Sequence, residues 1–261
     1  MNPFELNQFS QRIAERIRNI PGHLTDREAK HLTLLTCLAK AEGEILEIGS
    51  FMGKSTVLLS KAAKKATNNP HIVAVDPLTQ PSATDPNVTG NKPSRDFFYA
   101  NLDKAGVEKD VEFHEMLSSD LAENWSRPIR MLWIDGDHTY DGVSSDFKYF
   151  SPHLATNGII AIHDVMHGFR GPDKVFIENI LQSDQFAAAG IVGSIGWAQK
   201  GNPTTQQRTQ NATLAKKLQA WLNAFSNPSL PKNLNKIWLK IKRAQVPHSA
   251  VEAETLQPPL Q

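Results

Sequence analysis

Hydrophobic residues in the first forty positions recur at steps of three and four residues, which is the spacing of one face of an α-helix. Two such runs are present, and their members are Phe9, Ile13 and Ile17, and then Leu32, Leu35 and Leu38. The pair Pro21-Gly22 interrupts the pattern between the runs, as expected of a turn. The pattern therefore predicts two helices that form an N-terminal helical cap over residues 1–40.

From residue 41 onward, short apolar runs alternate with stretches of helical spacing. We expect buried strands over 44–48, 71–76, 111–114, 131–134 and 159–162. We expect helices between them over 54–66, 96–104, 119–124 and 143–150. Five strands that alternate with helices predict an α/β fold with a doubly wound, Rossmann-like and mostly parallel sheet. A helix over 175–181 and a strand near 190–197 extend this domain, which covers residues 41–200.

One long stretch between the second strand and the next helix has the composition of a loop. It runs from Pro77 to Arg95 and contains four prolines together with Ser, Thr, Asn and Gly residues. Loops of this length inside compact domains usually bind ligands, act as lids or are disordered. We therefore expect a long surface loop beside the second strand.

Residues 201–261 return to helical spacing and form a separate tail. One apolar face consists of Leu214, Leu218, Trp221, Leu222 and Phe225, and a second consists of Leu234, Ile237, Trp238 and Ile241. We therefore expect a basic helical C-terminal tail whose two helices pack on the domain or on a partner. A homo-oligomer is one form that such a partner could take.

Charge is distributed unevenly along the chain. The net charge is +1, yet no acidic residue occurs between Asp184 and Glu252, where lysines and arginines give +9 and leave −8 for the remainder. Such a tail favours an anionic partner, for example nucleic acid, phospholipid headgroups or a phosphorylated substrate. The alternative is a solvated helical face without a partner.

The overall composition is that of a globular protein, with 40% hydrophobic and 21% charged residues over 261 positions. Cys37 is the one cysteine, which excludes an internal disulfide and a cysteine-cluster metal site and favours a role in helix packing. No apolar run reaches the length of a membrane span. The first residues lack the basic and apolar stretches of a secretory signal, so a cytoplasmic protein is expected.

The candidate chemistry lies at the predicted strand ends, because ligands of open α/β sheets bind beyond the carboxyl ends of the strands. The first strand ends in Glu47, and a glycine turn from Gly49 to Gly53 then opens the next helix. Glycines allow a backbone to approach a ligand closely, and the free N–H groups of a helix start favour an anion. The spacing of the two glycines matches neither the dinucleotide fingerprint nor a P-loop.

Three further strand ends are also polar. Asp76 closes the second strand, where a carboxylate can accept hydrogen bonds from both hydroxyls of a bound ribose, although a turn residue before Pro77 is the alternative. The fourth strand continues as Ile-Asp135-Gly-Asp137-His138-Thr-Tyr, and the fifth ends in His163-Asp164-Val165. These acids and histidines come from neighbouring strands, so we expect them to lie close together.

The glycine turn of the form acid-x-Gly-x-x-x-Gly, with the two motifs Ile-Asp-Gly-Asp-His-x-Tyr and His-Asp-Val, resembles class I S-adenosylmethionine-dependent methyltransferases. It is similar above all to the bacterial "methyltransferase 24" group that includes macrocin-type sugar O-methyltransferases, and more distantly to catechol and caffeoyl-CoA O-methyltransferases. The resemblance covers about residues 40–200 and does not include the tail. It implies that the residues of the cofactor site are Glu47, Gly49, Ser50, Gly53, Ser55, Asp76, Ser118 and Asp135.

Within that resemblance, single residues take particular roles. Ser55 is similar to the serine that holds the methionine carboxylate, Asp76 to the ribose acid, and Ser118 to a polar residue near the adenine. Asp135 and Asp164 correspond to magnesium ligands in the metal-dependent relatives. His163 stands where those relatives usually carry an acid, a departure that matters because magnesium prefers oxygen ligands.

Methyl transfer from a sulfonium to a hydroxyl is an in-line displacement in which the oxygen gives up its proton, so a base or a metal ion must assist. His138 is the candidate base, because neutral imidazole is present at physiological pH and the catechol-type relatives carry a lysine three residues after the equivalent of Asp135. Asp137 is grouped with it as a catalytic residue. The alternative for His138 is a capping or hydrogen-bonding role at the next helix.

These observations predict an S-adenosylmethionine-dependent O-methyltransferase that acts on a hydroxyl of a small molecule. Analogy with the family suggests a sugar of a natural product, glycolipid or polysaccharide. A nicotinamide-dependent oxidoreductase would show a closer glycine spacing. A non-catalytic binding protein and a protein whose basic tail binds RNA or an anionic membrane surface stay open, although the aromatic and basic pattern of a known RNA module is absent from the sequence.

Overall fold

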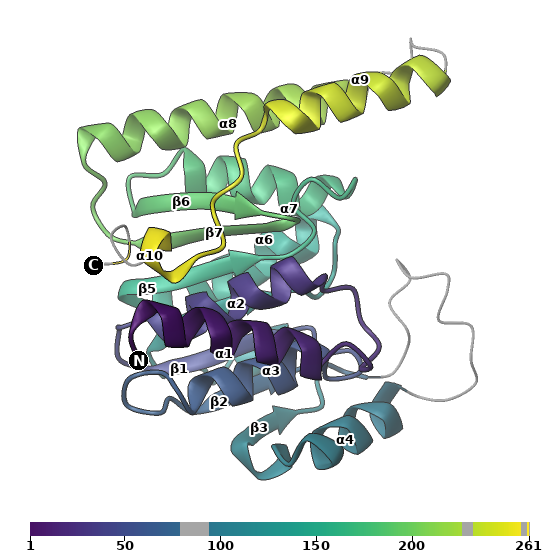
Figure 1. Ribbon diagram of the computed structural model, residues 1–261, viewed down its shortest axis with the longest axis vertical. Coiled ribbons are helices and arrows are strands. Elements are labelled where there is room, and N and C mark those ends of the chain that lie inside the picture. Colours follow the sequence, from purple (N-terminus) through teal and green to yellow (C-terminus); the bar gives the residue numbers. More distant parts are fainter. Residues whose placement is uncertain (79–93, 226–231, 257–259, 261) are drawn as a thin grey trace.

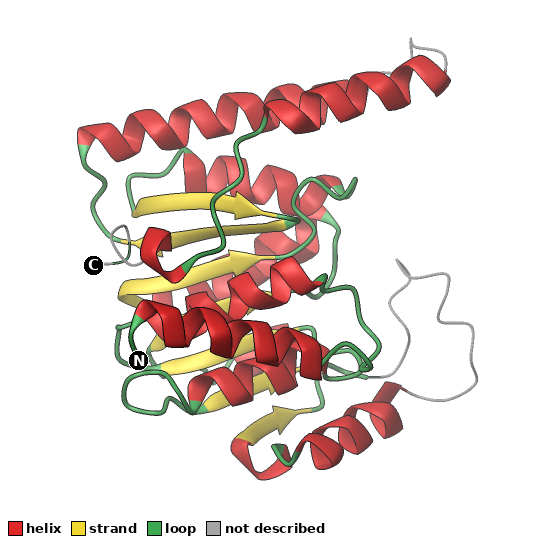
Figure 2. Ribbon diagram, viewed as in Figure 1, coloured by secondary structure: helices red, strands yellow, loops and turns green. Residues whose placement is uncertain are grey.

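A computed structural model describes residues 1–78, 94–225, 232–256 and 260 of the chain. A seven-stranded sheet lies between two layers of helices, with a long helical pair along one edge (Figure 1 and Figure 2). The predicted loop over 77–95 lies outside the described residues except at its two ends.

The strands follow the order expected of a doubly wound fold. They are β1 (Glu44–Ile48), β2 (Ile72–Val75), β3 (Val111–His114), β4 (Ile129–Ile134), β5 (Leu154–Ile162), β6 (Phe186–Val192) and β7 (Ile195–Lys200). The spatial order is β3-β2-β1-β4-β5-β7-β6, and β1 to β5 are parallel. This arrangement confirms the predicted α/β class and the mostly parallel sheet, and its chain reversal between β1 and β4 is the place where such folds bind ligands.

The end of the sheet differs from the sequence prediction. The single strand expected near 190–197 is wrong, because β6 and β7 form an antiparallel hairpin with Gly193 and Ser194 in the turn. Gly193 adopts a φ of 63°, a conformation that glycine takes without strain. The residues on both sides of this turn are apolar, which is why the pattern concealed the reversal.

Helices that precede or connect the parallel strands cover one face of the sheet. They are α1 (Pro3–Arg16), α2 (Asp26–Leu38), α3 (Lys54–Ala63) and α4 (Ser94–Ala105). Leu32 and Leu35 of α2 belong to the same buried cluster as Ile45 of β1 and Trp133 of β4. The predicted N-terminal helices therefore exist and share the core of the sheet, while the predicted domain boundaries stay a prediction.

The other face carries the remaining connecting helices. They are α5 (Ser118–Ala122), α6 (Tyr140–Phe150) and α7 (Arg170–Val175), and the last continues as a π-helical stretch over Phe176–Leu181. Val143 and Phe150 of α6 pack with Leu132 and Ile160 of the sheet. On the first face, Phe98 and Trp133 are fully buried core residues.

The start of the first two helices is encoded locally. Asn2 and Glu5 exchange side-chain-to-backbone hydrogen bonds of 2.9 and 3.0 Å at the start of α1. Thr25 and Glu28 form the same capping box at the start of α2. A capping box satisfies two N–H groups that the helix itself leaves unpaired.

The tail begins with α8 (Thr205–Phe225), which packs on the sheet through Leu214 and Leu218, as predicted. It continues through α9 (Lys232–Gln245), crosses the edge strand β6 where Ser249 N donates to Ile191 O, and ends in α10 (Ala253–Leu256) beside α1 (Figure 1). The side chains of Leu234, Ile237 and Phe225 lie outside the described residues. None of the described helices is both long enough and apolar enough to cross a bilayer.

Candidate active site

Polar side chains gather at the edge of the sheet where four parallel strands end. Glu47 is the residue before the last one of β1, Asp76 follows β2, Asp135 follows β4 and Asp164 follows β5. The strand order places β1 between β2 and β4, with β5 next to β4. The topology therefore brings together the residues that the sequence separates by more than a hundred positions.

The turn after β1 is held against the end of β4. Gly49 has a φ of 85°, and a Cβ there would lie 2.7 Å from Gly136 Cα and overlap the backbone of Asp135. Asp135 N in turn donates to Ile48 O at 2.8 Å. Glycine is therefore required at position 49 because two backbones approach each other closely.

Gly53 closes the same turn and begins α3 in the left-handed region, with a φ of 84°. It provides no side-chain cap for the N–H groups of the first helical turn. These groups and the helix dipole favour an anionic group at this end. Ser55, the predicted contact of the methionine carboxylate, lies buried in this turn.

Asp76, which follows the neighbouring strand β2, holds the turn after β1 through hydrogen bonds. Its Oδ2 accepts hydrogen bonds from Ser50 N at 2.7 Å and from Phe51 N at 2.8 Å, and its Oδ1 accepts one from Leu78 N at 2.8 Å. Phe51 adopts a positive φ of 47°, which the two hydrogen bonds help to maintain. Oδ1 can accept one further hydrogen bond, so Asp76 can offer a ribose fewer acceptor positions than a free carboxylate could. Its predicted ribose role stays a prediction.

Glu47 is completely buried beneath the turn. Its Oε2 accepts hydrogen bonds from Thr56 Oγ1 at 2.5 Å and from Ser50 Oγ at 3.1 Å, whereas its Oε1 has no hydrogen-bond partner among the described residues. Burial raises the pKa of Glu47 to about 7, although the hydroxyls of Ser55, Thr56 and Ser50 oppose this shift. An unpaired buried carboxylate oxygen suits a cationic donor such as the ammonium group of a bound amino acid.

Ser118 lies at the start of α5 and donates through its Oγ to Asp146 Oδ1 of α6 at 2.5 Å. Burial raises the pKa of Asp146 to about 6, and this hydrogen bond opposes the shift. The hydroxyl predicted to lie near the adenine is thus committed to a helix–helix contact, and its cofactor role stays a prediction.

Two histidine–aspartate pairs lie beside the turn. His163 Nδ1 is 2.9 Å from Asp135 Oδ1, and His138 Nε2 is 2.9 Å from Asp164 Oδ2. Each pair joins a residue at the end of β4 to a residue at the end of β5. The four predicted side chains are therefore brought together, but the histidine paired with each acid comes from the other strand end.

The charges of these pairs stabilise one another. Burial disfavours a charged His163, but the carboxylates of Asp135 and Asp164 outweigh it and raise the pKa of His163 to about 9. Burial likewise opposes charge on His138, whose pKa is nevertheless raised by Asp164. Burial alone would raise the pKa of Asp164, yet the imidazoles of His138 and His163 outweigh burial and lower this pKa.

A cation site can be formed by three of these residues. One ligand atom each of Asp135, His138 and Asp164 lies within 4.8 Å of the others. This set contains the two predicted acids but has His138 in place of His163, whose Nδ1 faces Asp135. Two carboxylates and one imidazole suit a divalent ion that accepts mixed oxygen and nitrogen ligands better than one that demands oxygen alone.

Asp137 is placed differently from the two pairs. Its carboxylate accepts hydrogen bonds of 2.9 Å from Thr139 N and from Thr139 Oγ1, at the start of α6. The side chain is exposed, and a Cβ on Gly142 would overlap it. This local contact accounts for Asp137 structurally, and its catalytic role stays a prediction.

The comparison with protein families decides the class of this site. Residues 46–165, which contain all of the strand ends described above, match the family model described as a methyltransferase domain. Residues 46–165 therefore belong to the methyltransferase domain family. By this match, the protein is a methyltransferase.

Solved structures share the architecture at low sequence identity. An O-methyltransferase from Bacillus cereus in complex with SAH (S-adenosylhomocysteine) is 20% identical, with a TM-score of 0.54 over 75% of this chain and 97% of that chain. TomG from Streptomyces achromogenes, in complex with SAM, is 19% identical, with a TM-score of 0.52 over 77% of this chain and 90% of that chain. The calicheamicin methyltransferase CalS11 is 16% identical, with a TM-score of 0.51 over 76% of this chain and 93% of that chain. At these identities the likeness supports the fold.

The segment that carries Asp164 is strained and is held from two sides. Asp164 and Met166 have positive φ values of 60° and 65°, which non-glycine residues adopt at an energetic cost. Met166 N donates to Asp173 Oδ1 at 2.7 Å, and Val165 N donates to Ser194 O at 2.9 Å. The methyltransferase thus fixes one of its site acids through contacts outside the two motifs.

Glu28 of α2 supports this arrangement from the N-terminal helices. Its Oε1 accepts hydrogen bonds from Ser194 N at 2.6 Å and from Ser194 Oγ at 2.7 Å. Its Oε2 accepts from Thr25 at the start of α2. A capping acid therefore also anchors the β6–β7 turn that holds Val165.

Sequence reasoning missed several of these residues. Thr56, Asp146, Asp173, Phe169 and the pair Glu28–Ser194 were not predicted. Asp146 had a usable signal, because it lies three residues after Val143 and four before Phe150, on the apolar face of α6. Phe169, whose ring centroid is 4.4 Å from that of His138, lies in an irregular loop and had no comparable signal.

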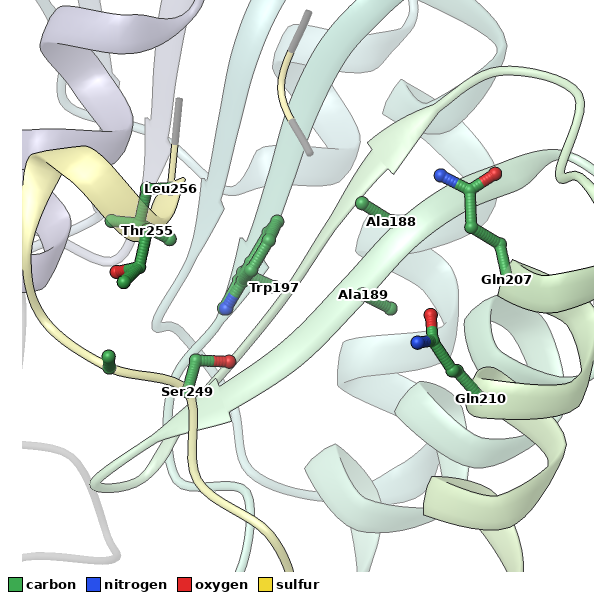
Figure 3. A pocket seen from close by; sticks show the side chains of 9 residues that line it. Ala188, Ala189, Trp197, Gln207, Gln210, Ser249, Thr255 and Leu256 are labelled. Atoms are coloured by element: carbon green, nitrogen blue, oxygen red, sulfur yellow. The ribbon is translucent and has the colours of Figure 1, made fainter. Parts of the chain in front are cut away.

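A separate cavity lies away from these strand ends (Figure 3). It has a volume of about 280 Å³ between the β6–β7 hairpin, α8 and the segment after α9, with Trp197, Gln207, Gln210 and Ser249 among its lining residues. None of the residues that line it has a side chain that ionises near neutral pH. This cavity therefore provides no acid or base, whereas the strand ends provide several.

Substitution of Glu47 should make stability less dependent on pH. In the folded protein the pKa of this carboxyl is about 7, above its ordinary value of 4.5, so its contribution to stability is present below pH 4.5 and is lost as the pH rises through 7. Glu47→Gln cannot ionise, so its Tm relative to the wild type should rise between pH 5 and pH 8.5. Scanning calorimetry at both pH values checks this, with exposed Glu123→Gln as the control; a parallel shift at both pH values contradicts it.

Glu28 and Glu5 provide a matched test of the anchoring contact. Both occupy the same position of a capping box, but only Glu28 also contacts Ser194. Glu28→Gln replaces an acceptor oxygen by a donor facing Ser194 N, so the free energy of unfolding should fall by about 1–3 kcal/mol. Glu5→Gln, which is exposed, should change it by less than about 0.5 kcal/mol. Equal effects in urea unfolding would show that Glu28 acts as a helix cap alone.

Proposed function

We propose that this methyltransferase transfers the methyl group of S-adenosylmethionine to a hydroxyl oxygen of a small molecule. The observation that carries the proposal is the placement of the two pairs, Asp135–His163 and His138–Asp164, directly beside the glycine turn. A carbon–oxygen bond forms as the carbon–sulfur bond breaks, the sulfur leaves uncharged, and the hydroxyl proton must pass to an acceptor. A site with a base next to the cofactor turn meets that requirement.

The cofactor site is proposed to follow the turn after β1. When bound, S-adenosylmethionine supplies an electrophilic methyl group on a sulfonium. Glu47 Oε1 is proposed to accept a hydrogen bond from its ammonium group, and the start of α3 with Gly53 and Ser55 to hold its carboxylate. Asp76 is proposed to contact the ribose while it maintains the backbone of Ser50 and Phe51. Ser118 and Asp135 complete the predicted set.

His138 is proposed as the base that receives the hydroxyl proton. Its side chain comes from the loop between β4 and α6, is 15% exposed and contacts the ring of Phe169. Both ring nitrogens are buried and Nε2 faces Asp164, so Nδ1 is the nitrogen proposed to receive the proton. Asp164 lies where it orients the imidazole and balances the charge that the imidazole gains. His163 and Asp135 are proposed to support this pair electrostatically.

A divalent metal ion is a further proposal for the same place. Asp135, His138 and Asp164 would hold it, since their ligand atoms converge within 4.8 Å. When bound, such an ion acidifies a coordinated hydroxyl and orients it. His138 then serves as a ligand rather than as a base, so the two proposals are separable by experiment.

The acceptor is proposed to be a sugar hydroxyl in a natural product, glycolipid or polysaccharide. This rests on the resemblance of the motifs to macrocin-type enzymes. The names of two structural neighbours, one a calicheamicin methyltransferase and the other involved in tomaymycin synthesis, support a natural product but name no sugar. A panel of glycosylated and phenolic acceptors, assayed for incorporation of labelled methyl, tests the acceptor class. Binding of S-adenosylhomocysteine without transfer to any acceptor would support the non-catalytic alternative.

Removal of the imidazole should separate catalysis from cofactor binding. We expect His138→Ala to lower kcat by about 10²–10⁴-fold, the usual contribution of a general base, while the Kd for S-adenosylhomocysteine changes little. His71→Ala is the control, because His71 lies at the opposite end of the sheet, before β2. Steady-state kinetics and calorimetric titration provide the measurements. Wild-type turnover in His138→Ala would contradict the assignment.

Metal removal distinguishes the two forms of assistance. If an ion is needed, treatment with EDTA should abolish turnover, and added Mg²⁺ or Mn²⁺ should restore it. Asp164→Asn should then lower the affinity for Mn²⁺ measured by calorimetry, whereas Asp137→Asn should not, since its carboxylate is committed to Thr139. Full turnover after EDTA would exclude the metal and leave His138 as the base.

A further inference from the structure

We propose that α9 docks the protein on a membrane surface that contains anionic lipid. The helix combines exposed apolar side chains with a high positive charge, and it projects from the edge of the sheet. The methyltransferase domain does not account for either property, because the family match ends at residue 165.

The apolar part of this surface is centred on Trp238 and Ile241. These side chains are 40% and 46% exposed, and they lie three residues apart, on one face of the helix. The other four tryptophans of the chain are at most 7% exposed. The sequence continues the same spacing with Leu234 and Ile237. An apolar helical face that the described part of the chain leaves exposed indicates contact with another surface.

The basic part accompanies it on the same helix. α9 contains no acidic residue, and its basic residues are Lys232, Lys236, Lys240, Lys242 and Arg243. Lys240 and Lys242 precede and follow Ile241, so each lies about 100° around the helix from it. Lys242 Nζ is 4.6 Å from the ring of Trp238, which keeps the ammonium beside the apolar face. Lysines in this arrangement can reach lipid phosphates while the apolar side chains enter the interface.

The position of α9 leaves this face accessible. The helix packs against α8, and its far end extends past the sheet in the direction in which the arrowheads of β3 and β6 point (Figure 1). The carboxyl ends of the parallel strands, with Asp135 and Asp164, lie at that same end. A surface that binds α9 therefore approaches the end of the molecule that carries the candidate active site.

The combination favours a lipid surface over the other anionic partners. A helix with one apolar face, an otherwise polar surface rich in lysine, and a tryptophan at the boundary is typical of a helix that lies in a membrane interface. Nucleic acid binding would use the lysines but does not call for an exposed Ile241. Docking of a second copy through the same face would bring two helices of like charge together.

Vesicle co-sedimentation with the full chain tests the proposal. The protein should sediment with vesicles of phosphatidylcholine and phosphatidylglycerol at low salt, much less at high salt, and little with phosphatidylcholine alone. Lys240→Glu with Lys242→Glu should weaken binding at least about 25-fold, at roughly fivefold for each lysine near an anionic surface. Trp238→Ser should weaken it about tenfold or more through lost apolar burial.

Matched variants distinguish binding through α9 from a general effect of net charge or of any exposed apolar side chain. Lys40→Glu with Lys104→Glu changes the net charge equally at exposed positions after α2 and in α4, and Phe4→Ser removes an exposed apolar side chain from α1. Both should bind vesicles as the wild type does. Because the other tryptophans are already buried, a blue shift of fluorescence on addition of vesicles reports Trp238. Trp238→Phe should keep binding and lose that shift.

Each remaining outcome overturns the proposal. No sedimentation with either vesicle, or equal loss in the matched control variants, removes α9 as a lipid-binding helix. A concentration-dependent dimer in light scattering that Trp238→Ser abolishes, without vesicle binding, assigns the face to a second copy. RNA binding in a filter assay that the lysine variants weaken, without vesicle binding, assigns it to nucleic acid. Unchanged circular dichroism and Tm of the surface variants establish that folding is not the cause.

Discussion

The close approach of two backbones, at Gly49 after β1 and at Asp135–Gly136 after β4, is the constraint on which the site depends. Because no side chain separates them, the turn that contains Ser50 and Phe51 lies within reach of Asp76 on one side and Asp135 on the other. Any residue larger than glycine at position 49 would push these strand ends apart. The proposed cofactor site and the two histidine–aspartate pairs are neighbours for this reason.

Burial of charge is the second feature of the site. Glu47, His163 and Asp164 are almost inaccessible to solvent, and an isolated charge in such surroundings is strongly disfavoured. The pairs compensate one another, whereas Glu47 keeps an oxygen without a partner among the described residues. A buried group left unsatisfied in this way is costly for folding, and such groups concentrate where a protein binds a ligand.

The regions outside the methyltransferase domain contribute to this site as well as to packing. Glu28 of α2 binds the β6–β7 turn, and that turn holds Val165. Asp173 of α7 holds Met166, so the strained segment of Asp164 is fixed from two sides. The geometry of the site therefore depends on the folding of the N-terminal helices. The tail differs, since Trp238, Lys240, Ile241 and Arg243 of α9 are exposed.

The sequence by itself determined the five parallel strands, the helices between them, the glycine turn and the motifs that carry Asp135, His138, His163 and Asp164, because spacing and turn residues are local properties. It did not determine the β6–β7 hairpin, since apolar residues on both sides of Gly193 concealed the reversal. Only the tertiary structure decided which histidine meets which acid, that Ser118 is committed to Asp146, and that Glu28 reaches Ser194. Those contacts join residues up to 166 positions apart, and they depend on strand order and packing rather than on any pattern along the chain.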